Sequence, residues 1–166
     1  MLAFAVRETG VSLAPIPFSA PWFDEDEAAR VRSALSGPLA GNGPFCQKVE
    51  ARLQRLLGVR RVLLTTNCTH AMQLALLARV NGPGLSVICP SFTFVSTANA
   101  ILRVGAPVVF ADIEERTLGL DPGDVERRIQ DDTAALLPVH YGGLAAEMTA
   151  LLDLARGRGL KVIEDA

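Results

Sequence analysis

The feature that most constrains the fold of this chain is a repeating unit that begins near Arg60. In each unit a short apolar run is followed by a polar turn and then by a segment of helical length, such as Thr69 to Val80. The runs are Arg61 to Thr65, Leu85 to Cys89, Pro107 to Ala111, Ala134 to Val139 and Leu160 to Glu164. Strands that are apolar on both faces and alternate with helices are typical of a parallel sheet covered by helices on each side. We therefore expect an α/β fold.

Two helices are expected before this repeat. Asp24 to Ser36 opens with acidic residues and ends at Gly37-Pro38, a charge order and a stop that favour a helix. The glycines and prolines from Gly37 to Pro44 predict a loop, because residues of these types forbid regular structure. Apolar residues then recur at helical spacing from Phe45 to Leu56, up to a glycine cap at Gly58. Residues 1–15 are expected to form an amino-terminal tail, and residues 16–166 to belong to one domain.

Charge and cysteine content argue against several classes of function. The net charge is −2, without a basic stripe for nucleic acid or a polybasic segment for an anionic membrane. Cys46, Cys68 and Cys89 are widely spaced, so neither a disulfide framework nor a zinc site is indicated. No stretch approaches the roughly 18 uncharged residues of a membrane helix. We expect a cytoplasmic protein that holds no metal and binds neither nucleic acid nor membrane.

The first candidate binding element is the turn from Leu64 to Ala71. Free backbone N–H groups at the start of the following helix, with the hydroxyls of Thr66 and Thr69, would form a cradle suited to a phosphate. Plain helix capping by Asn67 or Thr69 explains the same residues equally well. The turn is neither a Walker A loop nor a GxGxxG motif, so ATP and dinucleotides are not favoured as ligands.

The next strand-end turn contains two aromatic residues, Phe92 and Phe94. A flat cofactor ring at this edge of the sheet would stack on one of them, although core packing is the more common role of such a pair. His140 follows a later strand. It could contact a ligand, and a hydrogen-bonded structural role is equally compatible with its position.

Asp165 follows an apolar strand, where an ionised carboxylate is costly unless it meets a cation. A protonated pyridine nitrogen is such a cation, and its pairing with an aspartate maintains the electron sink of pyridoxal-phosphate (PLP) chemistry. A helix cap, a salt bridge and a magnesium ligand are the alternatives, the last weakened by the lack of a phosphate loop. Ligands of open α/β sheets gather at the carboxyl ends of strands, so the sequence stops in the middle of an expected site.

Taken together, these motifs resemble the DegT/DnrJ/EryC1/StrS family of sugar aminotransferases from about Ile16 to Ala166. The family's blocks follow in order and at its spacings: Ile16-Pro17-Phe18, Gly37 to Phe45, Asn67-Cys68-Thr69, Pro90 to Ala100, Val139 to Gly143 and Ile163-Glu164-Asp165-Ala166. Ser91 to Ala100 and His140 to Met148 are especially similar to the branch that transaminates dTDP-4-dehydro-6-deoxyglucose.

The resemblance implies part of a fold type I large domain, a homodimer, and amino transfer from glutamate to a nucleotide-linked 4-keto-6-deoxy sugar. By position, Cys68 and Thr69 would hold the phosphate of pyridoxal 5'-phosphate, Phe94 would stack on its pyridine ring and Asp165 would pair with its nitrogen. The turn Asn67-Cys68-Thr69 departs from the family's Ser-Gly-Thr, because Cys68 lacks the freedom of glycine at positive φ.

The family's Schiff-base lysine stands in a Ser-x-x-x-x-Lys block after the Glu-Asp motif, which places it beyond Ala166. The chain's own lysines are Lys48 and Lys161, and four residues of strand would put Lys161 about 13 Å from Asp165. We therefore expect residues 16–166 to be the amino-terminal part of the PLP-binding domain, and the isolated chain to be inactive. The alternative is a non-catalytic module that binds PLP or a partner subunit and is complemented by a second polypeptide.

Overall fold

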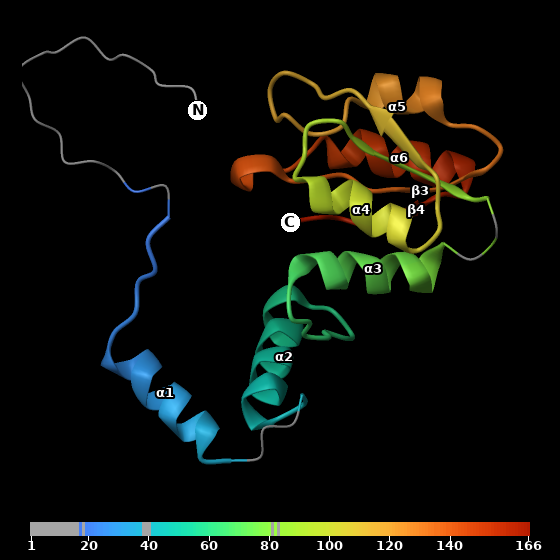
Figure 1. Cartoon of the computed structure of the whole chain (residues 1–166). Helices are drawn as coiled ribbons and strands as arrows, with labels where there is room; N and C mark the ends of the chain where they lie inside the picture. The colour runs from blue at the N-terminus through green and yellow to red at the C-terminus, as the bar shows by residue number, and fades with distance from the viewer. Residues whose placement is uncertain (1–16, 18, 38–40, 81, 83) are drawn as a thin grey trace, which may run out of the picture. The chain divides into compact units, whose positions relative to one another are not determined.

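The computed structural model describes residues 17, 19–37, 41–80, 82 and 84–166. The described chain divides between Val62 and Leu63 into two compact units, drawn in Figure 1. The first unit contains helices α1 and α2, and the second contains a sheet with its covering helices. The expected tail over residues 1–15 lies outside the described residues, as does part of the loop expected at 37–44.

The first unit confirms both predicted helices, α1 (Glu25–Leu35) and α2 (Pro44–Leu57). At the start of α1, the Asp24 carboxylate accepts the Asp26 N–H at 2.8 Å and the Glu27 carboxylate accepts the Asp24 N–H at 2.9 Å, which satisfies amides that the helix leaves free. Helix α2 ends at Gly58, whose φ of 64° is a left-handed conformation that glycine adopts without steric cost. Neither helix has a buried residue.

The strand predicted over Arg61 to Thr65 is wrong. These residues form no strand, and the boundary between the two units falls among them. A strand is stabilised by hydrogen bonds to a neighbouring strand, and no described strand pairs with this segment. The apolar run alone therefore did not determine its structure.

The second unit confirms the predicted parallel sheet. Its strands are β1 (Ser86–Pro90), β2 (Val108–Ala111), β3 (Thr133–Leu136) and β4 (Lys161–Val162), in the order β2-β1-β3-β4. All three neighbouring pairs are parallel. Four of the five predicted strands are thus present, although β3 and β4 are shorter than expected.

Helices cover both faces of this sheet. Side chains alternate between faces along a strand, so Val87 and Cys89 of β1 pack on one face with α3 (Cys68–Arg79) and α4 (Val95–Arg103). Ile88 packs on the other face with α5 (Pro122–Arg128) and α6 (Met148–Arg158), and Figure 1 shows the two helix pairs on opposite sides of the strands. Each fully buried aliphatic side chain of this core contributes about 1.5–3 kcal/mol by leaving water.

The strand order produces a reversal of direction at the carboxyl ends of β1 and β3. These strands are neighbours, yet the chain leaves β1 for α4 on one face and leaves β3 for α6 on the other. Such a reversal is where ligands of open α/β sheets bind. Beyond the ends of β3 and β4, an isolated parallel bridge between Val139 and Asp165 carries the pairing to this edge.

A buried carboxylate ties α5 to the end of β2. Asp124 accepts the backbone N–H of Asp112 at 2.8 Å and pairs with Arg128 at 2.5 Å and Arg127 at 2.9 Å. The Arg128 guanidinium, with help from the Asp112 amide, holds the pKa of Asp124 at about 2. This cluster fixes the segment in which β2 passes into α5.

The segment between β2 and α5 also approaches the loop before α6 closely. Ile113 and Leu120 form an antiparallel bridge, and a Cβ placed on Gly119 would lie 2.6 Å from the Cβ of Ala146. Only a hydrogen fits at this point.

Every helix among the described residues is too short or too polar to span a bilayer.

Candidate functional site

Asp165 is the centre of a hydrogen-bonded group at the carboxyl edge of the sheet. Its Oδ1 accepts from the Cys68 thiol at 3.2 Å and its Oδ2 accepts from the Thr97 hydroxyl at 3.0 Å. The Thr97 hydroxyl lies 2.9 Å from that of Thr93, and because its own proton is used on Asp165, Thr93 is the donor in this pair. Residues from the start of α3, the first turn of α4 and the end of the chain thus converge on one carboxylate.

The partners of Asp165 are neutral donors. No Lys, Arg or His of the described residues forms an ion pair with it. The pKa of the Cys68 thiol is raised, first because the thiol donates to the Asp165 carboxylate and then because of burial and the nearby charge. Cys68 therefore stays a protonated donor at neutral pH, and the described part of the chain supplies no cationic partner to the carboxylate.

The turn before α3 shows capping and also leaves amides free. Asn67 is the N-cap, and its side-chain oxygen accepts the His70 N–H at 2.9 Å, so capping by Asn67 is confirmed. The N–H groups of Cys68 and Thr69 have no intrahelical acceptor, and the described residues offer them no other hydrogen bond. Cys68 is the first residue of the helix and has no positive φ, so the turn forms without glycine. The two free amides can hold an anion.

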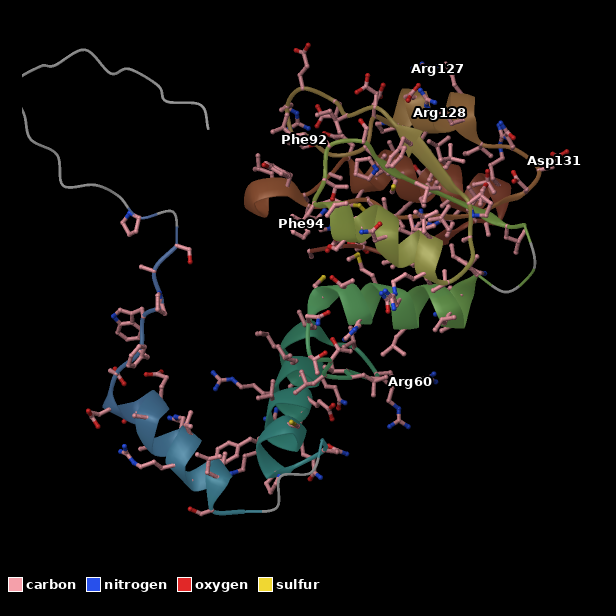
Figure 2. The ribbon with its side chains drawn as sticks, in the orientation of Figure 1. Arg60, Phe92, Phe94, Arg127, Arg128 and Asp131 are labelled. Carbon is pink, nitrogen blue, oxygen red and sulfur yellow. The ribbon has the colours of Figure 1, made fainter. Side chains whose placement is uncertain are left out.

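The aromatic residues of the next turn are exposed. Phe94 is the N-cap of α4 with 77% of its surface exposed, so the core-packing interpretation is wrong for it. Phe92 is also exposed and contacts Tyr141, with ring centroids 4.7 Å apart and planes tilted by 43°. Figure 2 shows both phenylalanines near the start of α4. An exposed aromatic ring therefore stands three residues before Thr97 in the sequence.

The family is decided by comparison with known proteins, because residues 21–166 match the DegT/DnrJ/EryC1/StrS aminotransferase family. The chain belongs to this family. It is 40% identical over 151 residues to the spore coat polysaccharide biosynthesis protein SpsC of Bacillus subtilis (strain 168), a match that covers 91% of this chain and 39% of SpsC.

Solved structures agree with this placement in the DegT/DnrJ/EryC1/StrS family. The structure of NtdA from Bacillus subtilis with bound cofactor PMP is 32% identical, with a TM-score of 0.82 over 96% of this chain and 38% of NtdA. That of DesI in the presence of its TDP-sugar product is 36% identical, with a TM-score of 0.75 over 86% of this chain and 36% of DesI. The chain thus spans about two fifths of the length of these relatives.

The residues assigned to the cofactor by the family resemblance lie near one another in the second unit. Cys68 and Asp165 are in direct contact, and Thr69 is the next residue of the same helix turn. Phe94 precedes α4, which also supplies Thr97 to Asp165. Sequence reasoning missed Thr97. Thr93 precedes α4 and Thr97 lies in its first turn, so their spacing in the sequence gave no signal for this contact.

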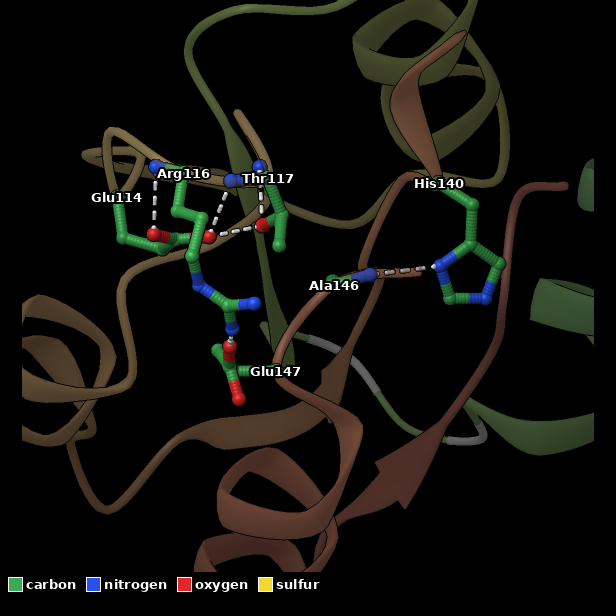
Figure 3. Close-up of polar contacts among 7 residues, drawn as sticks. Glu114, Arg116, Thr117, His140, Ala146 and Glu147 are labelled. Atoms are coloured by element: carbon green, nitrogen blue, oxygen red, sulfur yellow. Dashed lines mark hydrogen bonds and ion pairs between the residues drawn. The ribbon is translucent and has the colours of Figure 1, made fainter. Parts of the chain in front are cut away.

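His140, whose role the sequence left open, is hydrogen-bonded through both ring nitrogens. Its Nδ1 accepts the Ala146 N–H at 3.2 Å, shown in Figure 3, and its Nε2 lies 3.0 Å from the Glu164 carboxylate. The residue after Ala146, Glu147, forms an ion pair with Arg116 in the same view. The loop before α6 is therefore held from two directions.

Proposed function

We propose that the second unit forms the cofactor-binding part of a PLP-dependent aminotransferase that moves an amino group from glutamate to a nucleotide-linked 4-keto-6-deoxy sugar. The observation that carries the proposal is the Asp165 carboxylate, which lies at a strand end and, among the described residues, accepts hydrogen bonds from neutral donors only. Such a group is suited to a cationic ligand atom. The family match and the PMP and TDP-sugar product named for relatives support this class of ligand.

The residues present fit PLP. The free amides of Cys68 and Thr69 would hold its phosphate, the exposed ring of Phe94 would cover its pyridine face, and Asp165 would pair with its ring nitrogen. When bound, PLP supplies the electron sink for amino transfer. Each Asp165 oxygen accepts one hydrogen bond in the structure and retains capacity for another, so the nitrogen need not displace Cys68 or Thr97.

The residues of this chain orient the Asp165 carboxylate and leave its negative charge available to the cofactor. The Cys68 thiol and the Thr97 hydroxyl fix the direction of the carboxylate without adding positive charge. Because Thr97 is buried and itself accepts from Thr93, its hydroxyl proton is committed to Asp165. Preorganised groups of this kind stabilise charge more effectively than mobile water does.

We also propose that the 166-residue polypeptide carries out no amino transfer by itself. Lys161 pairs with Ala135 and Asp165 with Val139, so four residues in parallel register separate the lysine from the carboxylate, a distance of about 13 Å for extended chain. Lys48 lies in α2 of the first unit. In this proposal the complete enzyme is a cytoplasmic homodimer whose Schiff-base lysine comes from a segment other than residues 1–166.

The test is an equilibrium titration of the 166-residue chain with PLP, followed by absorbance. Asp165→Asn removes the charge and keeps an acceptor oxygen for only one of Cys68 and Thr97, so PLP affinity should fall about tenfold, as expected for losing a hydrogen bond to a charged group. Asp153→Asn, the same change at an exposed residue of α6, is the matched control and should leave affinity unchanged. Equal affinity in Asp165→Asn would remove Asp165 from the site.

An activity measurement on the same preparation tests the second proposal. With PLP, glutamate and a dTDP-linked keto-sugar, the chain should give no aminated product. Binding of PLP without turnover would fit both a part of the enzyme and a non-catalytic module that a second polypeptide complements. Multiple turnovers by material verified by intact mass would contradict the proposed need for a lysine outside these residues.

A further inference from the structure

The imidazole of His140 is held in one orientation and one tautomer. Its Nδ1 accepts the backbone N–H of Ala146 at 3.2 Å, so this nitrogen carries no proton. The proton is therefore on Nε2, which donates to Glu164 Oε2 at 3.0 Å. Only 15% of the side chain is exposed. Bonds at both nitrogens prevent the ring from turning.

The backbone of His140 is tied to Asp165. The His140 N–H donates to the Asp165 carbonyl at 2.9 Å, and the Asp165 N–H donates to the Pro138 carbonyl at 3.0 Å. Strand β4 ends three residues earlier, at Val162, so these two bonds hold the main chain where the carboxylate projects. The amide of His140 thus bonds the main chain of Asp165, and its imidazole bonds the side chain of the preceding Glu164.

We propose that His140 is a positioning residue that sets the direction of the Asp165 carboxylate. It acts through residues 164 and 165 from the segment that follows β3, because its imidazole donates to the Glu164 side chain and its amide donates to the Asp165 carbonyl. These two bonds together form a clamp. The proposal rests on the proposed function only for the use made of Asp165. The clamp itself concerns this chain alone and can be tested without cofactor or substrate.

Cys68 is a built-in reporter of where the carboxylate lies. Its thiol donates to Asp165, and that bond raises the thiol pKa. Alkylating reagents react with the thiolate, so a carboxylate that moves away from Cys68 makes the thiol react faster below its pKa. Cys89 serves as an internal control for folding, because it is fully buried and its pKa is raised to about 12 by that burial.

The experiment measures iodoacetamide labelling at pH 8 by peptide mass, in a Cys46→Ser background. Asp165→Asn sets the upper reference, because it removes the charge that Cys68 faces. His140→Ala should raise the labelling rate of Cys68 about threefold or more, since thiolate increases as the pKa falls. Glu164→Ala should reproduce most of this effect. His140→Asn, which keeps an acceptor for Ala146 but not the donor for Glu164, should give an intermediate rate.

Arg116→Ala is the matched control, because it breaks the ion pair to Glu147 in the same loop without touching residues 164 and 165. It should leave Cys68 labelling unchanged. The proposal is overturned if His140→Ala and Glu164→Ala keep the parental rate while Cys89 stays unlabelled. If Cys89 becomes labelled in His140→Ala, that variant is unfolded, and His140→Asn and Glu164→Ala take its place. Parental Cys68 labelling rates in these two variants would then overturn the proposal. An unchanged rate in Asp165→Asn would contradict the Cys68–Asp165 contact and, with it, the proposal.

Discussion

The two units of this chain have equally clear helix signals and very different interiors. Helix α1 starts with a capping box and α2 ends at the left-handed Gly58, yet neither helix buries a residue, and Leu56 of α2 is 75% exposed. In the second unit all five residues of β1 are buried, and helices lie on both of its faces. Caps and charge order are therefore enough to specify where a helix starts and stops, whereas a core needs a second layer to pack against.

The largest effect should come from exchanging the same side chain in the two units. Leu136→Ala in β3 removes a fully buried leucine and should lower the free energy of unfolding by about 2–5 kcal/mol. Leu56→Ala in α2 should change it by less than about 0.5 kcal/mol. Urea denaturation followed by circular dichroism gives both values. Similar losses at the two positions would show that α2 buries its leucine in solution and would remove the contrast.

A smaller effect is expected from the buried carboxylate of α5. The folded pKa of Asp124, about 2, lies below the ordinary value near 3.8, so its stabilisation is present above that value and is lost as the pH falls toward 2. Asp124→Asn should lower the free energy of unfolding by about 1–2 kcal/mol at pH 7, a modest loss because the arginine partners are partly exposed. The free energy of unfolding of this variant should also fall less steeply than that of the parent between pH 4 and pH 2.

Asp153→Asn supplies the control for this pH dependence. Asp153 pairs with Arg156 on the surface of α6, where both side chains are mostly exposed, and such a pair contributes less than about 1 kcal/mol. Its unfolding curves from pH 2 to pH 7 should follow those of the parent chain. An Asp124→Asn curve parallel to the parent's would show that the acid sensitivity arises elsewhere.

The smallest effect concerns the cap of α1. Asp24→Ala should speed amide exchange in the first turn of α1 by a few-fold, because the Asp26 amide loses its acceptor. Asp26→Ala removes the same charge without removing the cap and should have less effect. Hydrogen exchange resolved by residue distinguishes them, and unchanged protection around the sheet would confirm that the cap acts within its own unit.

Much of the fold could be predicted because its signals are local. Asp24 and Gly58 mark helix ends by their own hydrogen bonds and backbone freedom, and the buried runs mark β1 to β4. The segment Arg61 to Thr65 could not be predicted from its apolar run, because a strand also depends on a partner elsewhere in the chain. The same limit applies to the order β2-β1-β3-β4, which no local pattern encodes.

The places of the candidate residues along the fold could be predicted, but their contacts could not. Asp165 could be placed at a strand end and Cys68 at a helix start from the sequence alone. Their hydrogen bond joins residues 97 positions apart, and it depends on the order in which the strands assemble. The bond of His140 to Glu164 depends in the same way on the assembly of the sheet, whereas its bond to Ala146 joins residues only six positions apart.

The close approach at Gly119 makes the interior of this unit sensitive to changes far from Asp165 in the sequence. Any side chain at position 119 must push against Ala146, whose amide is the donor to His140. In a saturation-mutagenesis library, position 119 should therefore be as sensitive to substitution as the residues around Asp165. Small replacements there should be tolerated better than large ones. A compensating Ala146→Gly change should restore the stability of some of these variants.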